Sequence, residues 1–362
     1  MKAPFLAWLS VLAVIIATGC AGQRFEYAEH KMGTSFRIVL YAPDQHTANK
    51  AARAAYHRID QLNAILSDYD PESELSRLSR RSTESAPTDP VVVSNELFEV
   101  LSASQSYAQL TNGAFDVTVG PMVKLWRRSR RQEALPSEQR LETARAAVGY
   151  RHLRLDAEQR TVRLMVPNMR IDLGGIGKGY ALDQVLLELH RFGIRRALID
   201  GGGDIAVGAA PPGRTGWCLA IHDLDGQTDQ SVTLSYAAIA TSGDTQRFVE
   251  VEAVRYSHII DPTTGLGLRQ RIGASVIGPS GTSADALASA LCVLGAERGL
   301  ALAESLPGIE ARIVTRNKGR TEVRETPRFG VDRRPQTKAM DQRAPALDRR
   351  PDRVRNRPMP HL

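Results

Sequence analysis

Cysteine is scarce in this chain of 362 residues, which contains only three. Cys20 lies in an N-terminal segment, while Cys218 and Cys292 each stand alone in apolar sequence. Isolated cysteines build no disulfide framework, and they lack the paired spacing of a cysteine-based zinc site. Neither class of protein is supported by the cysteine pattern.

Aromatic residues are also few, at 6% of the chain, and no RNA- or DNA-binding motif is present. The net charge of +7 is concentrated at one end, because residues 331–362 hold nine Lys or Arg against four Asp or Glu. The rest of the chain is therefore close to neutral, and we expect no nucleic-acid partner. Few large apolar groups and many Pro, Arg and Asp predict that residues 331–362 form a disordered basic tail.

The N-terminus carries a short apolar run, Phe5 to Ala17, which follows Lys2 and precedes Thr18-Gly19-Cys20. A positive start, an apolar stretch and a small-residue end predict a secretory signal peptide over residues 1–19. The run is too short for a stable membrane-spanning helix.

Ala17-Thr-Gly-Cys20 resembles a bacterial lipobox, in which the cysteine becomes the lipidated first residue of the mature protein. Ala17 stands where leucine is usual in that motif. We expect a membrane anchor through a lipidated Cys20, and an ordinary signal peptide is the alternative.

The body of the chain, residues 20–330, has a globular composition, and the chain as a whole is 42% hydrophobic and 24% charged. Expected strands and helices come in runs without strict βαβ alternation, which favours an α+β fold over a doubly wound sheet. Apolar spacing and caps predict helices over Thr47–Leu66, Ser94–Thr111, Ser137–Ala147, Tyr180–Phe192, Thr282–Leu294 and Glu297–Ser305.

Other segments are expected to be extended or irregular. Alternation predicts one strand within Arg24–Tyr41 and short strands at Arg170–Leu173 and His258–Asp261. Residues 80–90 are predicted to be a surface loop, and Gly120-Pro121 is expected to end an extended segment. The arginines at 127, 128, 130 and 131 are interpreted as a solvated loop; contact with a phosphate or a membrane surface is the alternative.

The most informative stretch is Ile171-Asp-Leu-Gly-Gly-Ile-Gly-Lys-Gly-Tyr-Ala-Leu-Asp183. Its glycines allow positive φ and close backbone approach, and a helix beginning near Lys178 would direct free N–H groups and a positive dipole end at a ligand. Neither the P-loop order nor the G-x-G-x-x-G spacing is present. The stretch therefore predicts an anion cradle, and a glycine-dependent strand-to-helix turn is the alternative.

Asp285 and Ser289 lie at i and i+4 of a predicted helix and so share one face. A carboxylate, a hydroxyl and a carbonyl from the Gly-rich turn would suit Mg²⁺, which prefers oxygen ligands and retains waters. The alternative is that Asp285 favours the helix dipole and Ser289 packs against a neighbour.

Eight segments resemble, in the same order, the ApbE family of FAD:protein FMN transferases, and the resemblance covers roughly Phe25 to Gly330. The segments are Met32-Gly-Thr, Leu66–Ser76, Gly113–Pro121, Asp172–Asp183, Asp200–Asp204, Ala240–Asp244, His258–Gly265 and Ala284–Ala290. The resemblance implies one large α+β, T-fold-like domain with mixed or antiparallel sheets and packed helices.

The same resemblance implies a bacterial periplasmic enzyme anchored to the membrane. Such an enzyme uses Mg²⁺ and FAD, moves the FMN half onto a Thr or Ser hydroxyl of an acceptor flavoprotein through a phosphoester bond, and releases AMP. It also implies that Gly175, Asp285 and Ser289 hold Mg²⁺. FAD contacts are implied for Met32, Tyr69, Ala114, Phe115, Asp116, Lys178, Ser242, Ile259 and Ile260.

Within that picture, Tyr69 would stack on the isoalloxazine ring and Lys178 would meet FAD, and Lys178 and the metal ligand Asp285 are candidate catalytic residues. His258 is the candidate base for the acceptor hydroxyl, with packing or adenine contact as alternatives. The family commonly has Ala at position 175 and Thr at position 289, where this chain has Gly and Ser. Two other functions stay open: FAD pyrophosphatase activity, and non-catalytic flavin binding by a lipoprotein.

Overall fold

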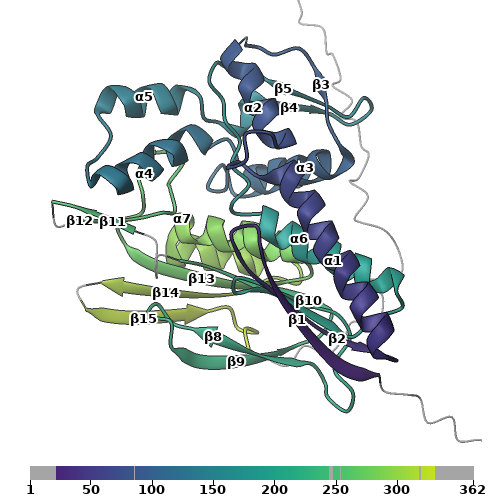
Figure 1. Cartoon of the computed structure of the whole chain (residues 1–362). Coiled ribbons are helices and arrows are strands. Elements are labelled where there is room, and N and C mark those ends of the chain that lie inside the picture. The colour runs from purple at the N-terminus through teal and green to yellow at the C-terminus, as the bar shows by residue number, and fades with distance from the viewer. Residues whose placement is uncertain (1–21, 85, 244–247, 253, 318, 331–362) are drawn as a thin grey trace, which may run out of the picture.

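The computed structural model describes residues 22–84, 86–243, 248–252, 254–317 and 319–330. The predicted signal peptide, Cys20 and the predicted basic tail lie outside these residues. Its centre is an eight-stranded sheet in the order β1-β2-β6-β7-β10-β13-β14-β15 (Figure 1). Neighbouring strands in this sheet are antiparallel. The strands are β1 (Gln23–Lys31), β2 (Thr34–Ala42), β6 (Ala197–Gly201), β7 (Asp204–Val207), β10 (Ala237–Gly243), β13 (Arg271–Gly278), β14 (Glu310–Asn317) and β15 (Arg320–Glu325).

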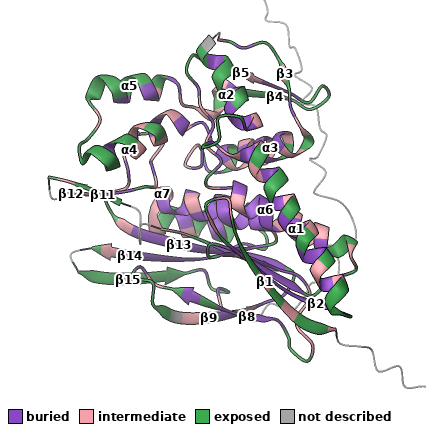
Figure 2. Cartoon of the chain, in the orientation of Figure 1, coloured by how far each residue is buried: buried purple, intermediate pink, exposed green. Residues whose placement is uncertain are grey.

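Three helices cover one face of this sheet: α1 (Gln45–Leu66), α6 (Gly177–Arg191) and α7 (Gly281–Ser305). Their apolar sides and the facing strands form the main core, which appears as the buried layer in Figure 2. The hairpin of β8 (Trp217–His222) and β9 (Thr228–Leu234) packs on the opposite face through a separate apolar cluster. The architecture is thus the α+β fold with antiparallel sheets and packed helices that the sequence predicts.

A smaller layer lies beyond the helices. It contains α2 (Glu74–Glu84), α3 (Asn95–Leu110) and a sheet of β3 (Val91–Val92), β5 (Thr161–Leu164) and β4 (Leu153–Asp156). A 3-10 turn (Tyr150–His152) comes directly before β4. Helices α4 (Gly120–Gln132) and α5 (Glu138–Ala146) pack with the hairpin of β11 (Phe248–Val251) and β12 (Val254–Ser257).

Helix α7 is long and apolar enough to cross a membrane by length and composition alone. Its apolar residues have another explanation, because Ala284, Leu287, Ala288 and Leu291 lie in the main core. Gly295, at φ 79°, interrupts the helix where the sequence predicts the boundary between two helices. The other predicted helices are confirmed within a few residues at each end.

Several expectations about extended and irregular segments are wrong. Arg24–Tyr41 is a hairpin and not one strand, because Met32 and Gly33 both adopt positive φ and form its turn. Residues 80–84 continue α2, where the buried Ser82 donates a 2.8 Å hydrogen bond to the carbonyl of Met169.

Gly120-Pro121 begins a helix instead of ending a strand, since proline is compatible with the first helical turn. The arginines at 127–131 consequently lie on α4 and not in a loop. Segments 170–173 and 258–261 form isolated bridges only, Val119 with Arg170 and Ile260 with Gly267. Strands β14 and β15 were not predicted.

Candidate functional site

The Gly-rich turn leads into α6 at the point where α6 crosses α7. A Cβ atom on Gly179 would lie only 2.1 Å from the carbonyl oxygen of Gly281, so the two backbones meet without side chains between them. The glycines at 174, 175, 177 and 179 are absent from the positive-φ positions of the described chain. At Gly175 and Gly179 glycine permits close approach to α7, and the left-handed backbone that the sequence suggested is not needed.

Asp285 faces this turn from α7 and is only 2% exposed. One carboxylate oxygen, Oδ2, accepts a 3.0 Å hydrogen bond from the backbone N–H of Gly179, and Oδ1 lies 3.6 Å from Nζ of Lys178. Burial raises the pKa of Asp285 to about 6, although the neighbouring ammonium acts in the opposite direction. A carboxylate and a lysine are therefore held together at the N-terminus of α6.

Lys178 is shared between two acids, because its ammonium also donates to Oδ2 of Asp204 on β7. Oδ1 of Asp204 accepts a 3.2 Å hydrogen bond from the backbone N–H of Thr241, which fixes the carboxylate against β10. Burial alone would lower the pKa of Lys178, but Asp285 and Asp204 together raise it. The side chain thus stays a cation, and it is still 30% exposed.

Ser289 lies one helical turn after Asp285 and points toward the Gly-rich turn. A Cβ atom on Gly175 would be 2.9 Å from Oγ of Ser289 and 3.4 Å from the Phe115 ring. The Ser289 hydroxyl also lies 3.0 Å from Oγ of Ser242, at the end of β10. Four chain segments therefore converge, and the residues predicted to hold a metal lie on the same side of the molecule.

The donors gathered here fit a magnesium ion. Asp285 and Ser289 offer a carboxylate and a hydroxyl, and the close approach of Gly175 brings a backbone segment beside them. No group of three or more His, Cys, Asp or Glu suited to a metal occurs among the described residues. A site with a single carboxylate favours a hard ion that retains waters and accepts phosphate oxygens over a zinc-type site.

Tyr69 lies in the loop between α1 and α2 and is 74% exposed. Its ring is nevertheless held in place, because the guanidinium of Arg127 lies 4.0 Å from the ring centroid. An exposed but ordered tyrosine is suited to stack on a planar ligand.

Two other predicted flavin contacts lie in apolar surroundings. Met32 is half-buried between the two larger apolar clusters, and Phe115 packs edge-on against Tyr107.

Asp116 has a structural task in the loop after α3. Its Oδ1 accepts hydrogen bonds from the backbone N–H and hydroxyl of Thr118, at 2.8 and 2.6 Å, and its Oδ2 accepts one from the N–H of Tyr150 at 2.7 Å. The carboxylate thereby shapes the loop that carries Ala114 and Phe115. A contact between Asp116 and a flavin stays a prediction.

His258 follows β12 and is exposed to solvent. Ile260 is 7% exposed within the cluster of α4, α5 and the β11–β12 hairpin, whereas Ile259 is half-buried against the main core. Of the two isoleucines, Ile259 is thus the more accessible to a ligand. A role for His258 as base stays a prediction.

Three residues important to this geometry were not among the sequence candidates: Asp204, Arg127 and Asp183. Asp204 ends the Asp200–Asp204 segment, and its place at the start of a strand was the available signal. Asp183 accepts hydrogen bonds from the N–H groups of Gly281 and Thr282 and so fixes the start of α7. Arg127 gave no sequence signal that separates it from its arginine neighbours.

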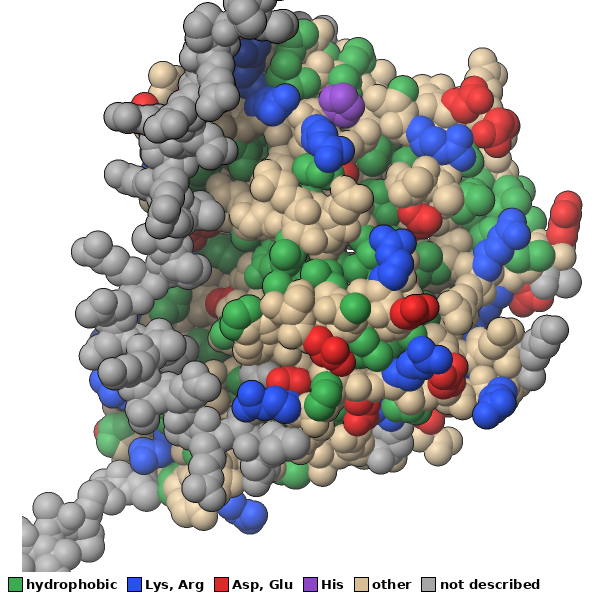
Figure 3. Space-filling model, turned by 180° about the vertical axis from the view of Figure 1, so that it is seen from behind, with side chains coloured by type: hydrophobic (Ala, Val, Ile, Leu, Met, Phe, Trp, Pro, Cys, Tyr) green, Lys and Arg blue, Asp and Glu red, His purple; other side chains and the backbone are tan. Residues whose placement is uncertain are grey.

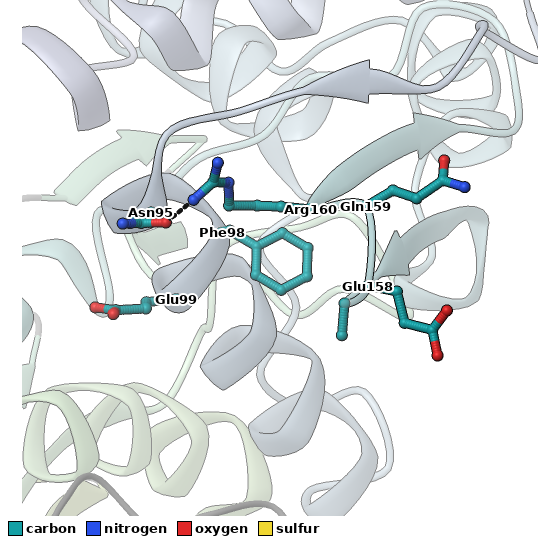
Figure 4. A pocket seen from close by; sticks show the side chains of 7 residues that line it. Asn95, Phe98, Glu99, Glu158, Gln159 and Arg160 are labelled. Atoms are coloured by element: carbon teal, nitrogen blue, oxygen red, sulfur yellow. Dashed lines mark hydrogen bonds between the residues drawn. The ribbon is translucent and has the colours of Figure 1, made fainter.

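One surface hollow is lined by residues other than the predicted site residues. This hollow, at the start of α3 and the β4–β5 turn, is lined by Asn95, Phe98, Glu99 and residues 157–160, with Arg160 donating to Asn95 (Figure 4). The face seen in Figure 3 intersperses positive and negative side chains.

Comparison with known proteins places the chain among relatives of similar sequence and length. The model of the ApbE family matches residues 32–313. The FAD:protein FMN transferase of Vibrio cholerae is 33% identical over 82% of this chain and 90% of its own length, and that of Treponema pallidum is 31% identical over 88% and 94%.

Solved structures agree with this similarity. The flavin transferase ApbE from Vibrio cholerae aligns with a TM-score of 0.74 at 30% identity, covering 85% of this chain and 98% of that one. The ApbE protein from Thermotoga maritima aligns with a TM-score of 0.75, also at 30% identity and with the same coverage of both chains.

Proposed function

The chain belongs to the ApbE family, and from this membership we propose that it is an FAD:protein FMN transferase. In the proposed reaction, FAD donates its FMN half to a Thr or Ser hydroxyl of an acceptor flavoprotein. The observation that carries the proposal is the convergence of the Gly-rich turn, Lys178 and the buried Asp285 at the start of α6.

The reaction is a phosphoryl transfer. The acceptor oxygen forms a bond to the phosphorus on the FMN side, the bond from that phosphorus to the bridging oxygen breaks, and AMP leaves with the electron pair. The acceptor hydroxyl loses its proton, for which His258 is the proposed base. Such a transfer needs positioning and neutralised charge more than covalent chemistry, and the Lys178 ammonium supplies a fixed positive charge.

We propose that Mg²⁺ is held by the Gly175 carbonyl, the Asp285 carboxylate and the Ser289 hydroxyl. When bound, the ion supplies charge neutralisation to the diphosphate. Asp204 would retain the Lys178 ammonium beside it, since Asp204 bonds that ammonium independently of Asp285.

FAD pyrophosphatase activity is the second candidate, in which water replaces the acceptor hydroxyl. The exposure of Tyr69 is compatible with hydrolysis. If no acceptor covers the flavin stacked on this ring, water can reach the phosphorus. Non-catalytic flavin binding is the third.

One experiment separates the three. The soluble domain is incubated with FAD, Mg²⁺ and an acceptor flavoprotein that has a defined flavinylated Thr, with its Thr-to-Ala form as the matched control. Fluorescent acceptor in a denaturing gel together with AMP supports transfer. AMP without labelled acceptor supports hydrolysis. If neither AMP nor labelled acceptor forms, non-catalytic flavin binding is the remaining function.

We also propose a periplasmic location, with the chain anchored through a lipidated Cys20. The support is the sequence of the N-terminal segment. Metabolic labelling with a fatty-acid analogue tests this proposal, and Cys20→Ser should abolish labelling and release the protein from the membrane fraction. Labelling that persists in Cys20→Ser would contradict it.

A further inference from the structure

Arg127 makes three contacts that no other residue of its helix duplicates among those described. Its two terminal nitrogens donate to two different carboxylates, NH1 to Oδ2 of Asp68 at 2.5 Å and NH2 to Oδ2 of Asp172 at 3.0 Å. Its guanidinium plane also covers the ring of Tyr69 at 4.0 Å. One side chain on α4 thus joins the loop after α1 to the segment that enters the Gly-rich turn.

The loop that carries Tyr69 is tied from two directions. Arg127 holds the side chain of Asp68, and NH2 of Arg170 donates a 2.5 Å hydrogen bond to the Asp68 carbonyl. With Asp68 fixed, the neighbouring Tyr69 is confined even though 74% of it is exposed. Because Arg127 occupies one face of the ring, the exposed area includes the other face.

The second partner, Asp172, belongs to the phosphate end of the proposed site. Its Oδ1 accepts a 2.8 Å hydrogen bond from the N–H of Gly174, and its own N–H donates to the carbonyl of Val117 at 2.7 Å. A shift of Arg127 would therefore be transmitted both to the tyrosine ring and to the first glycine of the turn. Arg127 is in contact with both of these parts.

We propose that Arg127 is a positioning residue for the isoalloxazine end of FAD, which holds the Tyr69 ring beside the Gly-rich turn with its open face toward the flavin. The inference rests on the proposed function. Arginine suits the task because its planar fork can bond two carboxylates at its edge while its face stacks on an aromatic ring. Lysine, as a point charge, cannot do all three.

The test compares Arg127→Lys and Arg127→Met with the wild-type chain. Arg128→Met is the matched control, since Arg128 is an exposed neighbour on α4 whose Nε donates to Gln132 on the same helix. FAD affinity is measured by quenching of flavin fluorescence, and KM and kcat by AMP release. We expect both Arg127 variants to raise Kd and KM for FAD about tenfold, with kcat changed much less and Arg128→Met unchanged.

Removing Arg127 also leaves Asp68 and Asp172 as two neighbouring buried acids, which by itself would disturb the turn. The double variant Arg127→Met/Asp172→Asn removes that repulsion. If Arg127 acts through the tyrosine ring, the double variant keeps the raised Kd. A return to wild-type affinity would overturn the positioning role and leave charge balance as the explanation.

A double-mutant cycle with Tyr69→Ala gives the second criterion. We expect Arg127→Lys to weaken FAD binding in the wild-type background and to add little when the ring is already absent. Additive effects, or an Arg127→Lys chain with wild-type Kd and KM, would overturn the inference. A wild-type chain that binds FAD without labelling an acceptor would refute the transferase proposal and leave the comparison of Kd values valid.

Discussion

A Cβ atom on Gly175 would lie 2.9 Å from Oγ of Ser289, so the Gly-rich turn and α7 touch at this pair. The resemblance to the ApbE family implies Ala and Thr as the common residues at these two positions, where this chain has Gly and Ser. At this point of contact, the turn and the helix thus each carry a residue smaller than the Ala and Thr common in the family. We interpret the two departures as one coupled feature of the proposed metal site.

Gly175→Ala should therefore weaken Mg²⁺ activation. The added methyl group would force the Ser289 hydroxyl to rotate away and lose its contact with Ser242. We expect the half-saturating Mg²⁺ concentration to rise about tenfold. The measurement is a magnesium titration of AMP release, and Ser289→Ala should cause no further loss in the Gly175→Ala background. Additive effects of the two changes would show that the positions act independently.

Asp285→Asn should remove most magnesium-dependent turnover, by about 100-fold or more, because it deletes the negative charge proposed to bind the ion. Asparagine keeps an oxygen that can accept the Gly179 N–H, so the crossing of α6 and α7 is preserved. Asp285→Ala should lose the same activity and more stability. AMP release across a magnesium titration, with thermal unfolding alongside, provides the measurement. Full turnover in Asp285→Asn would discard the metal assignment.

Asp204→Asn should raise the magnesium requirement without abolishing FAD binding. The Lys178 ammonium now divides its interactions between Asp204 and Asp285, and with Asp204 neutral it would pair with Asp285 alone. A cation on the proposed metal ligand opposes a second cation, and we expect about a tenfold increase in the half-saturating Mg²⁺ concentration. Titrations at fixed FAD measure this. An unchanged requirement would mean that Asp204 does not govern the position of Lys178.

The sequence predicted those parts of the fold that local patterns determine. Helix α1 follows from its apolar spacing and α3 from the Ser94 cap, which accepts a 3.3 Å hydrogen bond from the N–H of Leu97. Asp285 and Ser289 share a face because helix geometry fixes the direction of residues four apart. The order of expected elements predicted the α+β class, whereas the antiparallel sheets were implied by the family resemblance.

What the sequence could not predict depends on contacts between distant segments. The partnership of Lys178 with Asp204 exists only after β7 is placed beside α6. Gly120-Pro121 is equally compatible with the end of a strand and the first turn of a helix, and so the arginines beyond it were assigned to the wrong structure. Strand β15 is exposed along its whole length and therefore lacks the apolar alternation that marks a half-buried strand.

Asp183 should be a determinant of stability and not of chemistry. It accepts hydrogen bonds from the N–H groups of Gly281 and Thr282 and from the Thr282 hydroxyl, at 2.6, 2.9 and 2.6 Å. Asp183→Ala leaves three donors without this partner, and we expect the free energy of unfolding to fall by about 2–4 kcal/mol. Ser280→Ala, which removes the N-cap of the same helix, should cost only about 1 kcal/mol. Urea unfolding measures both, and equal losses would contradict the prediction.

His258→Ala tests the proposed base directly. If the imidazole removes the proton of the acceptor hydroxyl, transfer of FMN should fall about 10²- to 10⁴-fold, because general-base catalysis contributes that much. The Kd for FAD should stay within about twofold of wild type, since proton abstraction makes no contribution to ground-state binding. Single-turnover labelling of the acceptor and fluorescence titration of FAD separate the two quantities. His222→Ala, an exposed histidine on β8, is the control and should change neither. A His258→Ala chain that loses FAD affinity in proportion to its rate would assign His258 to cofactor binding, and one with full transfer activity would leave the base to another group.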